Sequence, residues 1–356
     1  MRILLMNSAR TWGGTEKWTR MAAESLADAG HHTILVYRRD AVGRNFTIPK
    51  FRLPCLSHID IYTLFKLARL IRNEKIEVVI PTKRKDYVLA GIAGRLTGTP
   101  VIVRLGADRR LRWPWQRFMY AALPEALIVN AEKIRETLLR TGWFRKARIK
   151  VIYNGLDTEE IDRLKYEPAD KPYPFTIGAL GRITRNKGFD YLIRSFALFI
   201  SSNPNADAGL VIMGEGADQP EFETLASKLG IADRVRFTGF IANPYPMLRQ
   251  CDIFAMTSTN EGLSNALLEA MYLGCAPVST FAGGVREVID EESNGFLVDY
   301  GNEERLASII ERLYRNENER QIIAHRAKET VIRQFSIPDM TESIVTFCKE
   351  IYDQAV

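Results

Sequence analysis

The sequence predicts an α/β protein made of two doubly wound Rossmann-like domains that face each other across a cleft. Short apolar runs alternate with stretches of helical length and period along the chain, which is typical of parallel sheets covered by helices. The 356 residues exceed what one hydrophobic core usually holds. Three prolines between Pro168 and Pro174 favour an extended linker, after which the alternation begins again.

The elements follow from these apolar runs in order. In the first half we predict strands at residues 3–6, 33–37, 76–80, 100–105, 126–129 and 149–153, with helices at 15–29 and 62–73. In the second half we predict strands at residues 175–180, 209–213, 234–238, 252–256, 276–280 and 295–298, with helices such as 191–201 and 222–229. We therefore place the N-terminal domain at residues 1–167 and the C-terminal domain at 174–337. A last helix, within residues 338–356, covers the second domain or, as we favour, returns to the first.

Charge is distributed unevenly between the two halves. Residues 1–170 contain 31 Lys and Arg against 18 Asp and Glu, whereas the remaining residues contain 18 against 25. A basic half joined to an acidic half suggests that the first domain binds an anionic partner.

The cysteines and apolar segments indicate the compartment. The four cysteines show no close pairing of the kind found in disulfide frameworks or zinc sites. The N-terminal apolar run is too short for a signal peptide, and no segment is long enough to cross a bilayer. We expect a cytoplasmic protein, which would meet the inner face of the cytoplasmic membrane only peripherally.

Two carboxylates frame the strand–loop–helix unit of residues 252–287. Glu261 lies in the loop, Ser264 or Asn265 can cap the helix, and Glu269 lies about five residues inside it, roughly 7–8 Å along the axis. A diphosphate could bind the free N–H groups at the helix start, with Glu269 accepting hydrogen bonds from a ribose. However, an acid before a helix cap is common, and a helical glutamate is usually only solvated.

Further loops at predicted strand ends have features suited to phosphate. Arg182 and Lys187 flank a helix entrance, where two cations could hold a diphosphate. Gly13 and Gly14 follow the first strand and open the first helix, where backbone N–H groups can approach an anion closely. The two glycines also fit a plain strand-to-helix turn, and they lack the spacing of a dinucleotide fingerprint.

Together these motifs resemble the ordered signature of the retaining glycosyltransferases of family 4, which have the GT-B fold. The resemblance covers the second domain almost completely and the first more loosely. The matching motifs are Gly13-Gly14-Thr15-Glu16, Gly181-Arg182 with Lys187-Gly188, Gly214-Glu215-Gly216, Phe237-Thr238-Gly239, and Glu261 with Glu269 followed by Gly283-Gly284.

The resemblance implies a nucleotide-sugar donor and a reaction that retains the anomeric configuration. By it, Arg182 and Lys187 neutralise the donor diphosphate, Glu269 holds the ribose, and Glu261 lies beside the donor sugar; we take Glu261, Arg182 and Lys187 as the catalytic residues. The other donor-binding residues implied are Gly13, Gly14, Gly262, Leu263 and Ser264. The chain has no Asp-x-Asp motif, so we expect no metal and no cofactor.

One departure from the family concerns the acceptor side. Many members have a histidine after the fourth strand of the first domain, whereas this chain has Arg104 to Asp108 there. Asp108 could take over part of the histidine's role, or it could be an ion-pair partner for nearby arginines.

The loops at the strand ends of the first domain are basic, which predicts an anionic acceptor such as a lipid-linked or lipopolysaccharide-type saccharide. The acceptor-binding candidates are Lys83, Arg84, Arg104, Asp108 and Arg109. Aromatic residues from Trp113 to Tyr120 interleave with arginines, which suits docking on an anionic membrane surface. Alternatively, these aromatic side chains pack onto the sheet.

Two other functions are compatible with parts of the pattern. A sugar-nucleotide epimerase of the same fold would need acid and base groups but no acceptor. A nucleic-acid-binding protein is suggested only by the basic half, and the acidic half with its phosphate loops gives it little support. We therefore expect no nucleic acid partner.

Overall fold

The chain folds into two compact α/β units. The computed structural model describes residues 1–107, 111–145 and 148–355. Unit 1 comprises Met1–Gly155 and Phe335–Val356, and unit 2 comprises Leu156–Gln334. The division therefore falls between Gly155 and Leu156, ahead of the proline-rich stretch where the sequence analysis placed it.

The strands of unit 1 are parallel. Their order is β3-β2-β1-β4 in one sheet and β5-β6-β7 in another, and a parallel bridge between Val79 and Val101 links the two. Strand β1 is almost wholly buried, because helices cover both of its faces. The strands are β1 (Arg2–Asn7), β2 (His32–Tyr37), β3 (Lys50–Arg52), β4 (Val78–Pro81), β5 (Ile102–Leu105), β6 (Ala126–Val129) and β7 (Ile149–Val151).

The helices of unit 1 follow the predicted pattern closely. Asp60 caps α3 by accepting a hydrogen bond from the Thr63 N–H, as expected for an aspartate before an apolar run. The helices are α1 (Gly14–Asp28), α2 (Asp40–Gly43), α3 (Ile61–Asn73), α4 (Arg84–Thr97), α5 (Pro114–Arg117), a π-helix η1 (Phe118–Ala122), α6 (Glu132–Leu139) and α14 (Ile337–Ala355).

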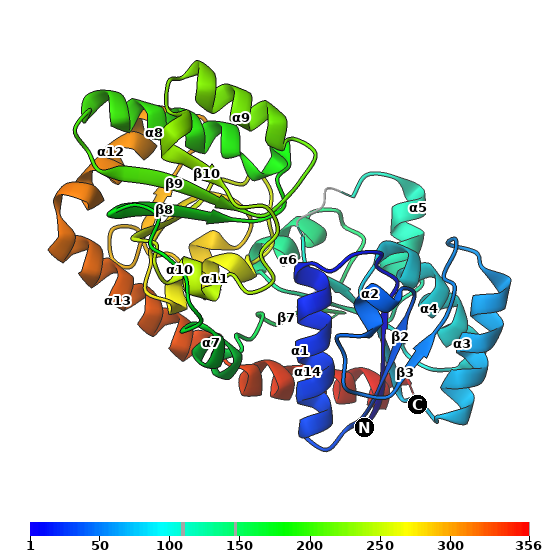
Figure 1. Ribbon diagram of the computed structural model, residues 1–356. Coiled ribbons are helices and arrows are strands. Elements are labelled where there is room, and N and C mark those ends of the chain that lie inside the picture. The colour runs from blue at the N-terminus through cyan, green and yellow to red at the C-terminus, as the bar shows by residue number, and fades with distance from the viewer. Residues whose placement is uncertain (108–110, 146–147, 356) are drawn as a thin grey trace. The chain divides into compact units, whose positions relative to one another are not determined.

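The C-terminal helix α14 belongs to unit 1. It lies beside α1, although the two helices come from opposite ends of the chain (Figure 1). Thr341 donates a hydrogen bond to the Ser25 hydroxyl at 2.8 Å, and Ile344 and Phe347 are buried in the core that α1 covers. The last element of the sequence thus completes the first core.

Unit 2 is built on one parallel sheet of six strands in the order β10-β9-β8-β11-β12-β13. The chain steps outward from β8 to β10 and then returns to the other side of β8, so a topological switch point lies between β8 and β11. The strands are β8 (Phe175–Leu180), β9 (Ala208–Met213), β10 (Val235–Phe237), β11 (Ile253–Met256), β12 (Ala276–Thr280) and β13 (Phe296–Val298).

Helices cover both faces of this sheet. In Figure 1, α8 lies beside α12, and α13 runs past α11. The helices are α7 (Thr158–Leu164), the 3₁₀ turn η3 (Arg185–Lys187), α8 (Phe189–Ser202), α9 (Gln219–Lys228), the 3₁₀ turn η4 (Ala232–Arg234), α10 (Tyr245–Leu248), α11 (Asn265–Tyr272), the 3₁₀ turn η5 (Val285–Glu287), α12 (Glu303–Arg315) and α13 (Glu317–Gln334).

Candidate functional site

The predicted donor residues of unit 2 lie on loops that follow neighbouring strands. Strand β11 pairs with β8 on one side and with β12 on the other, and all three run in the same direction. Arg182 and Lys187 follow β8, whereas Glu261 follows β11. Parallel strands end at one edge of the sheet, and a switch point at that edge is where ligands bind in open α/β sheets.

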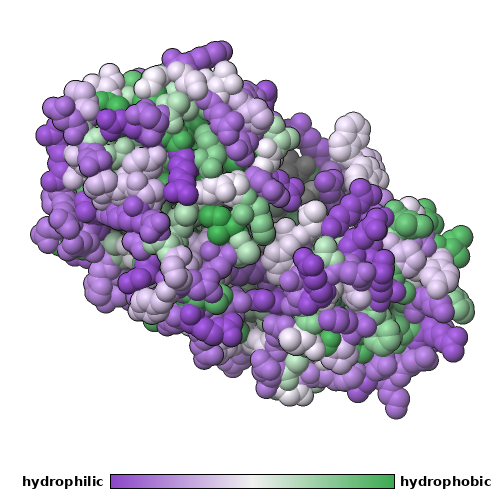
Figure 2. All heavy atoms as spheres, viewed as in Figure 1, coloured by the Kyte–Doolittle hydropathy of each residue, from purple (hydrophilic) through white to green (hydrophobic). Residues whose placement is uncertain are grey.

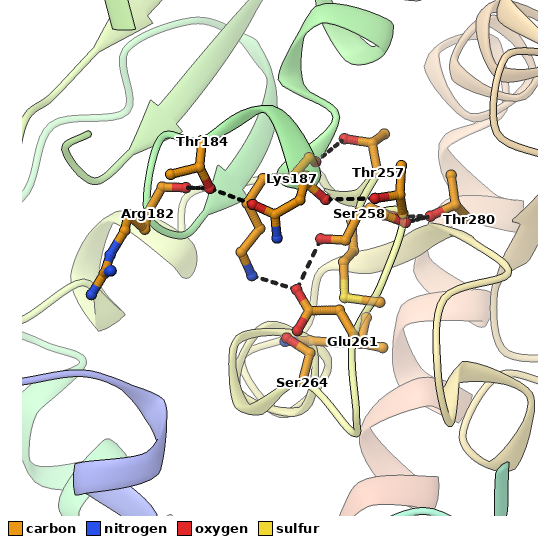
Figure 3. A network of polar contacts seen from close by, with 12 residues as sticks. Arg182, Thr184, Lys187, Thr257, Ser258, Glu261, Ser264 and Thr280 are labelled. Atoms are coloured by element: carbon orange, nitrogen blue, oxygen red, sulfur yellow. Dashed lines mark hydrogen bonds and ion pairs between the residues drawn. The ribbon is translucent and has the colours of Figure 1, made fainter. Parts of the chain in front are cut away.

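Lys187 and Glu261 form an ion pair at this edge (Figure 3). Their side chains are 23% and 18% exposed, so the pair is partly shielded from water yet still reachable from solvent. The Ser258 hydroxyl donates a second hydrogen bond to the same carboxylate oxygen at 2.9 Å. Two donors therefore hold the Glu261 carboxylate in a fixed position.

Threonine hydroxyls hold the loop after β11 against the loop after β8 on one side and against the end of β12 on the other. The Thr257 hydroxyl donates to the Lys187 carbonyl at 3.1 Å, and the Thr280 hydroxyl donates to the Ser258 carbonyl at 2.6 Å (Figure 3). Gly188 has φ +66°, and a Cβ there would lie 2.1 Å from the Thr257 carbonyl oxygen. Only glycine fits this close approach, so Gly188 allows the β8 loop to dock on the β11 loop.

Arg182 differs from the neighbouring cations. Its side chain is exposed, and its guanidinium group forms no hydrogen bond or ion pair within the described parts of the chain. In Figure 3 this side chain extends away from the network, whereas the Arg182 carbonyl accepts a hydrogen bond from the Thr184 hydroxyl at 3.4 Å. Arg185 is instead paired with Glu221 at 2.9 Å. Arg182 is therefore a cation free to meet an anion, whereas Arg185 already has its counter-charge.

The start of α11 lies directly after Glu261. Ser264 caps the helix by accepting a hydrogen bond from the Leu267 N–H at 3.4 Å, as one of the two predicted caps. The Gly284 N–H donates to the Gly262 carbonyl at 2.9 Å, which connects the glycine pair after β12 to this turn. The positive end of the α11 dipole is thus placed beside the ion pair, where it favours a bound anion.

The remaining donor candidates of unit 2 are less accessible. Gly262 and Leu263 are buried in the turn before α11, so only their backbone groups are suited to contact a ligand. Glu269 lies in the second turn of α11 and is 4% exposed. Its assignment to a ribose, like the assigned roles of the other site residues, stays a prediction.

In unit 1, Gly13 is the N-cap residue of α1, and Gly14 is its first residue. The buried Glu16 of the same helix pairs with Lys83 at 2.5 Å and accepts a hydrogen bond from Asn7. Lys83 was predicted to bind the acceptor, and the structure shows that its ammonium group already has a counter-charge.

Arg104 has an unexpected environment for an acceptor-binding candidate. It is 4% exposed, its guanidinium stacks over the Trp18 ring at 4.4 Å, and it donates to the Asn154 side chain at 3.1 Å. Burial lowers the pKa of Arg104 to about 10. Arg84 is exposed. Asp108 and Arg109 lie outside the described residues.

The aromatic residues from Trp113 to Tyr120 were expected either to dock on a membrane or to pack onto the sheet, and their environments differ. Tyr120 is buried and packs edge-on against Tyr87 at 5.4 Å. In contrast, Trp113, Trp115 and Phe118 are 65%, 49% and 53% exposed. Packing onto the core thus accounts for Tyr120, whereas the other three rings face solvent.

A second exposed apolar surface was not predicted. It lies at the start of α3 and in the loop before it, where hydrophobic surface is visible at the right of Figure 2. The α3 patch consists of Leu56, Ile59, Ile61, Tyr62 and Phe65, which are each at least 58% exposed. The signal for it in the sequence is the presence of apolar residues on both faces of α3.

Sequence reasoning also missed the hydroxyl groups that fix the site. Thr257, Ser258 and Thr280 were not singled out, although each follows or ends a strand at the ligand-binding edge. Their position directly after an apolar run was the available signal.

The described residues contain neither a metal-binding cluster nor a membrane-spanning helix. No group of three or more His, Cys, Asp or Glu side chains in the described part of the chain is arranged to hold a metal ion. Within the same ranges, no helix combines the length and apolar character needed to cross a bilayer.

Known proteins resemble the chain along most of its length. The sequence family described as Glycosyltransferase Family 4 matches residues 12–160, and the one described as Glycosyl transferases group 1 matches residues 160–330. The lipopolysaccharide core biosynthesis glycosyltransferase LpsE of Rhizobium meliloti is 28% identical over 93% of this chain and 94% of that protein. An Escherichia coli UDP-Gal:alpha-D-GlcNAc-diphosphoundecaprenol alpha-1,3-galactosyltransferase is 23% identical over 82% of this chain and 79% of its own.

Solved structures show the same fold. Anabaena Alr3699/HepE, crystallised with UDP and glucose, superposes with a TM-score of 0.85 at 22% identity and covers 98% of this chain and 100% of its own. The same family is indicated by the two sequence-family matches, by the order of the motifs and by the two α/β units. The chain is a glycosyltransferase with the GT-B fold and belongs to the family 4 glycosyltransferases.

Proposed function

We propose that the protein is a retaining, hexosyltransferase-type enzyme that moves a sugar from a nucleoside-diphosphate sugar to an anionic saccharide. UDP-sugars are the first donors to test, because UDP is bound in the HepE structures. Lipid-linked and lipopolysaccharide-type saccharides are the acceptors to test, because the relatives named above act in the synthesis of such glycans.

The observation that carries the proposal is the ion pair of Lys187 and Glu261 beside the start of α11, with the exposed Arg182 on the same loop as Lys187. As the sugar leaves, negative charge grows on the β-phosphate of the donor. Cations and a helix start placed at that phosphate stabilise the transition state more than the ground state. A metal ion is not needed for this role, and we propose that none is used.

Glu261 is suited to orient the donor sugar rather than to attack it. Its carboxylate accepts from both Lys187 and Ser258, and such bonds stabilise the anion and lower its nucleophilicity. We propose that retention proceeds by front-face substitution, in which the leaving phosphate accepts the proton of the incoming hydroxyl.

The test begins with donor binding. Thermal unfolding of the protein is measured against a panel of nucleoside diphosphates, because a ligand that binds only the folded state raises the melting temperature. Transfer from the matching nucleotide sugar is then followed, and NMR of the first product reports its anomeric configuration. Inversion at the anomeric carbon would exclude the proposed mechanism, and interconversion of the donor without an acceptor would indicate an epimerase.

Variants test the assigned site. Lys187→Ala and Glu261→Ala should each abolish most of the transfer. Glu221→Gln is a matched control on the same unit, because Glu221 pairs with Arg185 outside the network. Full activity in both alanine variants would refute the site. Transfer that survives EDTA treatment is the expected result for a metal-independent enzyme.

The exposed aromatic rings of unit 1 suit docking on an anionic membrane. Trp113 and Trp115 lie between the exposed Arg112 and Arg117, and the α3 patch lies on a helix that also exposes Lys66 and Arg69. Aromatic rings insert at the lipid headgroup level, while cations are attracted to anionic lipids. Changing both tryptophans to serine should therefore reduce flotation with phosphatidylglycerol vesicles, and unchanged flotation would argue against docking through this stretch.

A further inference from the structure

Arg38 of unit 1 is a buried cation without a counter-charge in the described chain. It follows β2 directly and is 9% exposed. No described residue forms a hydrogen bond or an ion pair with its guanidinium group. Because burying an unpaired charge is unfavourable, arginines in such positions are normally paired or bind an anion.

The sheet order brings two further cations to the same edge. Strand β1 lies between β2 and β4, and all three run in the same direction. Arg10, which is exposed, follows β1, and Lys85 lies in the first turn of α4 after β4. Burial and the positive charges of Arg38 and Arg10 lower the pKa of Lys85, so these three groups act on one another.

Lys85 is held in place by the backbone of the neighbouring loop. Its ammonium group donates to the carbonyl oxygens of Cys55 and Leu56, both at 3.1 Å. These acceptors are neutral, so they fix the ammonium group without cancelling its charge. The exposed Arg10 leaves the edge accessible to a ligand.

The acidic groups nearby are engaged in other contacts. Asp86 is fully buried and accepts a hydrogen bond from the Ser8 N–H at 2.8 Å. Asp60 accepts from the N–H groups of Leu56 and Thr63 at the start of α3. Neither carboxylate forms an ion pair with Arg38, so the described residues at this edge keep an excess of positive charge.

We propose that Arg38, Arg10 and Lys85 form a phosphate-binding site in unit 1 that holds a phosphate group of the acceptor. The proposal rests on the proposed function for the identity of the acceptor, and it adds the chemical group by which that acceptor is recognised. A phosphate group carries up to two charges and several acceptor oxygens, which match two guanidinium forks and one ammonium group better than a single carboxylate does.

Calorimetry with inorganic pyrophosphate tests the site on the full chain. Saturating UDP fills the donor site of unit 2, so that any remaining pyrophosphate binding reports on a second site. We expect one salt-sensitive site in the wild type. Arg38→Gln should weaken it by about 10-fold, as expected for the loss of one charge-assisted contact.

Two further variants guard against misfolding and general charge effects. Arg10→Gln changes an exposed side chain, so it should leave folding intact and weaken pyrophosphate binding by a smaller factor. Arg44→Gln removes the same charge from an exposed position on the connection between β2 and β3, and it should have no effect. Equal binding in the wild type, Arg38→Gln and Arg10→Gln would overturn the proposal.

Glucuronate and anionic vesicles distinguish the proposed phosphate site from a carboxylate site and from a lipid-binding site. Competition by glucuronate as strong as that by phosphate would assign the site to carboxylates and overturn the phosphate assignment. If Arg38→Gln weakens flotation with phosphatidylglycerol vesicles but not pyrophosphate binding, the cations serve lipid headgroups and not the acceptor. If the wild type does not bind UDP, the proposed donor site is contradicted instead. Pyrophosphate binding to the site in unit 1 can then still be measured without UDP.

Discussion

From the ion pair between Lys187 and Glu261 we expect one substitution to have opposite effects on nucleotide binding and on sugar transfer. In the proposed site, a donor diphosphate and Glu261 would share the same lysine. Replacing Glu261 by glutamine removes the competing charge and keeps the side-chain shape. Glu261→Gln should therefore bind UDP more tightly than the wild type, although it transfers sugar poorly.

The size of the gain follows from the geometry. A phosphate oxygen bonded to the lysine ammonium would lie about 5 Å from the glutamate carboxylate. At this separation, two unit charges repel by about 1.5 kcal/mol for an effective dielectric constant of about 40, which is suitable for a partly exposed pair. We thus expect about 10-fold tighter binding of UDP. Lys187→Met should have the opposite effect, because it removes a charge-assisted contact of about 1.5–3 kcal/mol.

Calorimetry with UDP at fixed ionic strength measures both effects. Glu221→Gln is the matched control, because it removes the same charge from an exposed ion pair of unit 2. Weaker UDP binding by Glu261→Gln would refute the reasoning. An equal gain in Glu221→Gln would show that only the overall charge of the unit matters.

Three further predictions concern stability. Burial raises the pKa of Asp86 from 3.8 to about 6, so the folded chain binds more protons than the unfolded chain between these pH values. The protein should therefore lose about 3 kcal/mol of stability as the pH rises through this range. In urea unfolding at pH 4 and pH 7, Asp86→Asn should lack this loss, and a pH profile of stability equal to that of the wild type would contradict the prediction. Tyr272→Phe removes a 2.9 Å hydrogen bond to Asp162 that joins α11 to α7, and it should lower the stability by about 1 kcal/mol in thermal unfolding. Asp252→Ala leaves Lys171 without its partner at 2.8 Å and the Thr176 N–H without its acceptor, and it should cost about 3 kcal/mol; a loss below 1 kcal/mol would show that these contacts are weak.

The fold was predictable because its signals are local. Apolar runs bounded by glycine, proline and polar residues gave most strands within one or two residues of their observed ends, and Ser264 was named as one of two possible caps. The short edge strand β3 was missed, since Lys50–Arg52 is exposed and has no apolar run. The boundary between the units lies earlier in the chain than the proline-rich stretch, because α7 packs against α10 of unit 2. The composition of the linker does not reveal this contact.

The site was predictable as a set of residues but not as an arrangement. Lys187 and Glu261 were both chosen, yet their pairing depends on β11 lying beside β8, which the sequence does not specify. Arg104 shows the reverse problem. Its position near the end of a predicted strand suggested acceptor binding, whereas Arg104 lies within β5 and is buried by stacking on Trp18 of α1.

In the proposed donor site, Arg182 and Lys187 would act at different steps of diphosphate binding. Arg182 is exposed and unpaired in the described chain, so it can attract a diphosphate without first breaking a contact. Lys187 must give up part of its pairing with Glu261 to reach the same phosphate. As it does so, the Glu261 carboxylate loses part of its compensation and becomes a stronger acceptor for a sugar hydroxyl. Diphosphate binding and sugar orientation would then be coupled through one lysine. For this reason Glu261→Gln should gain affinity for UDP but lose it for the complete nucleotide sugar.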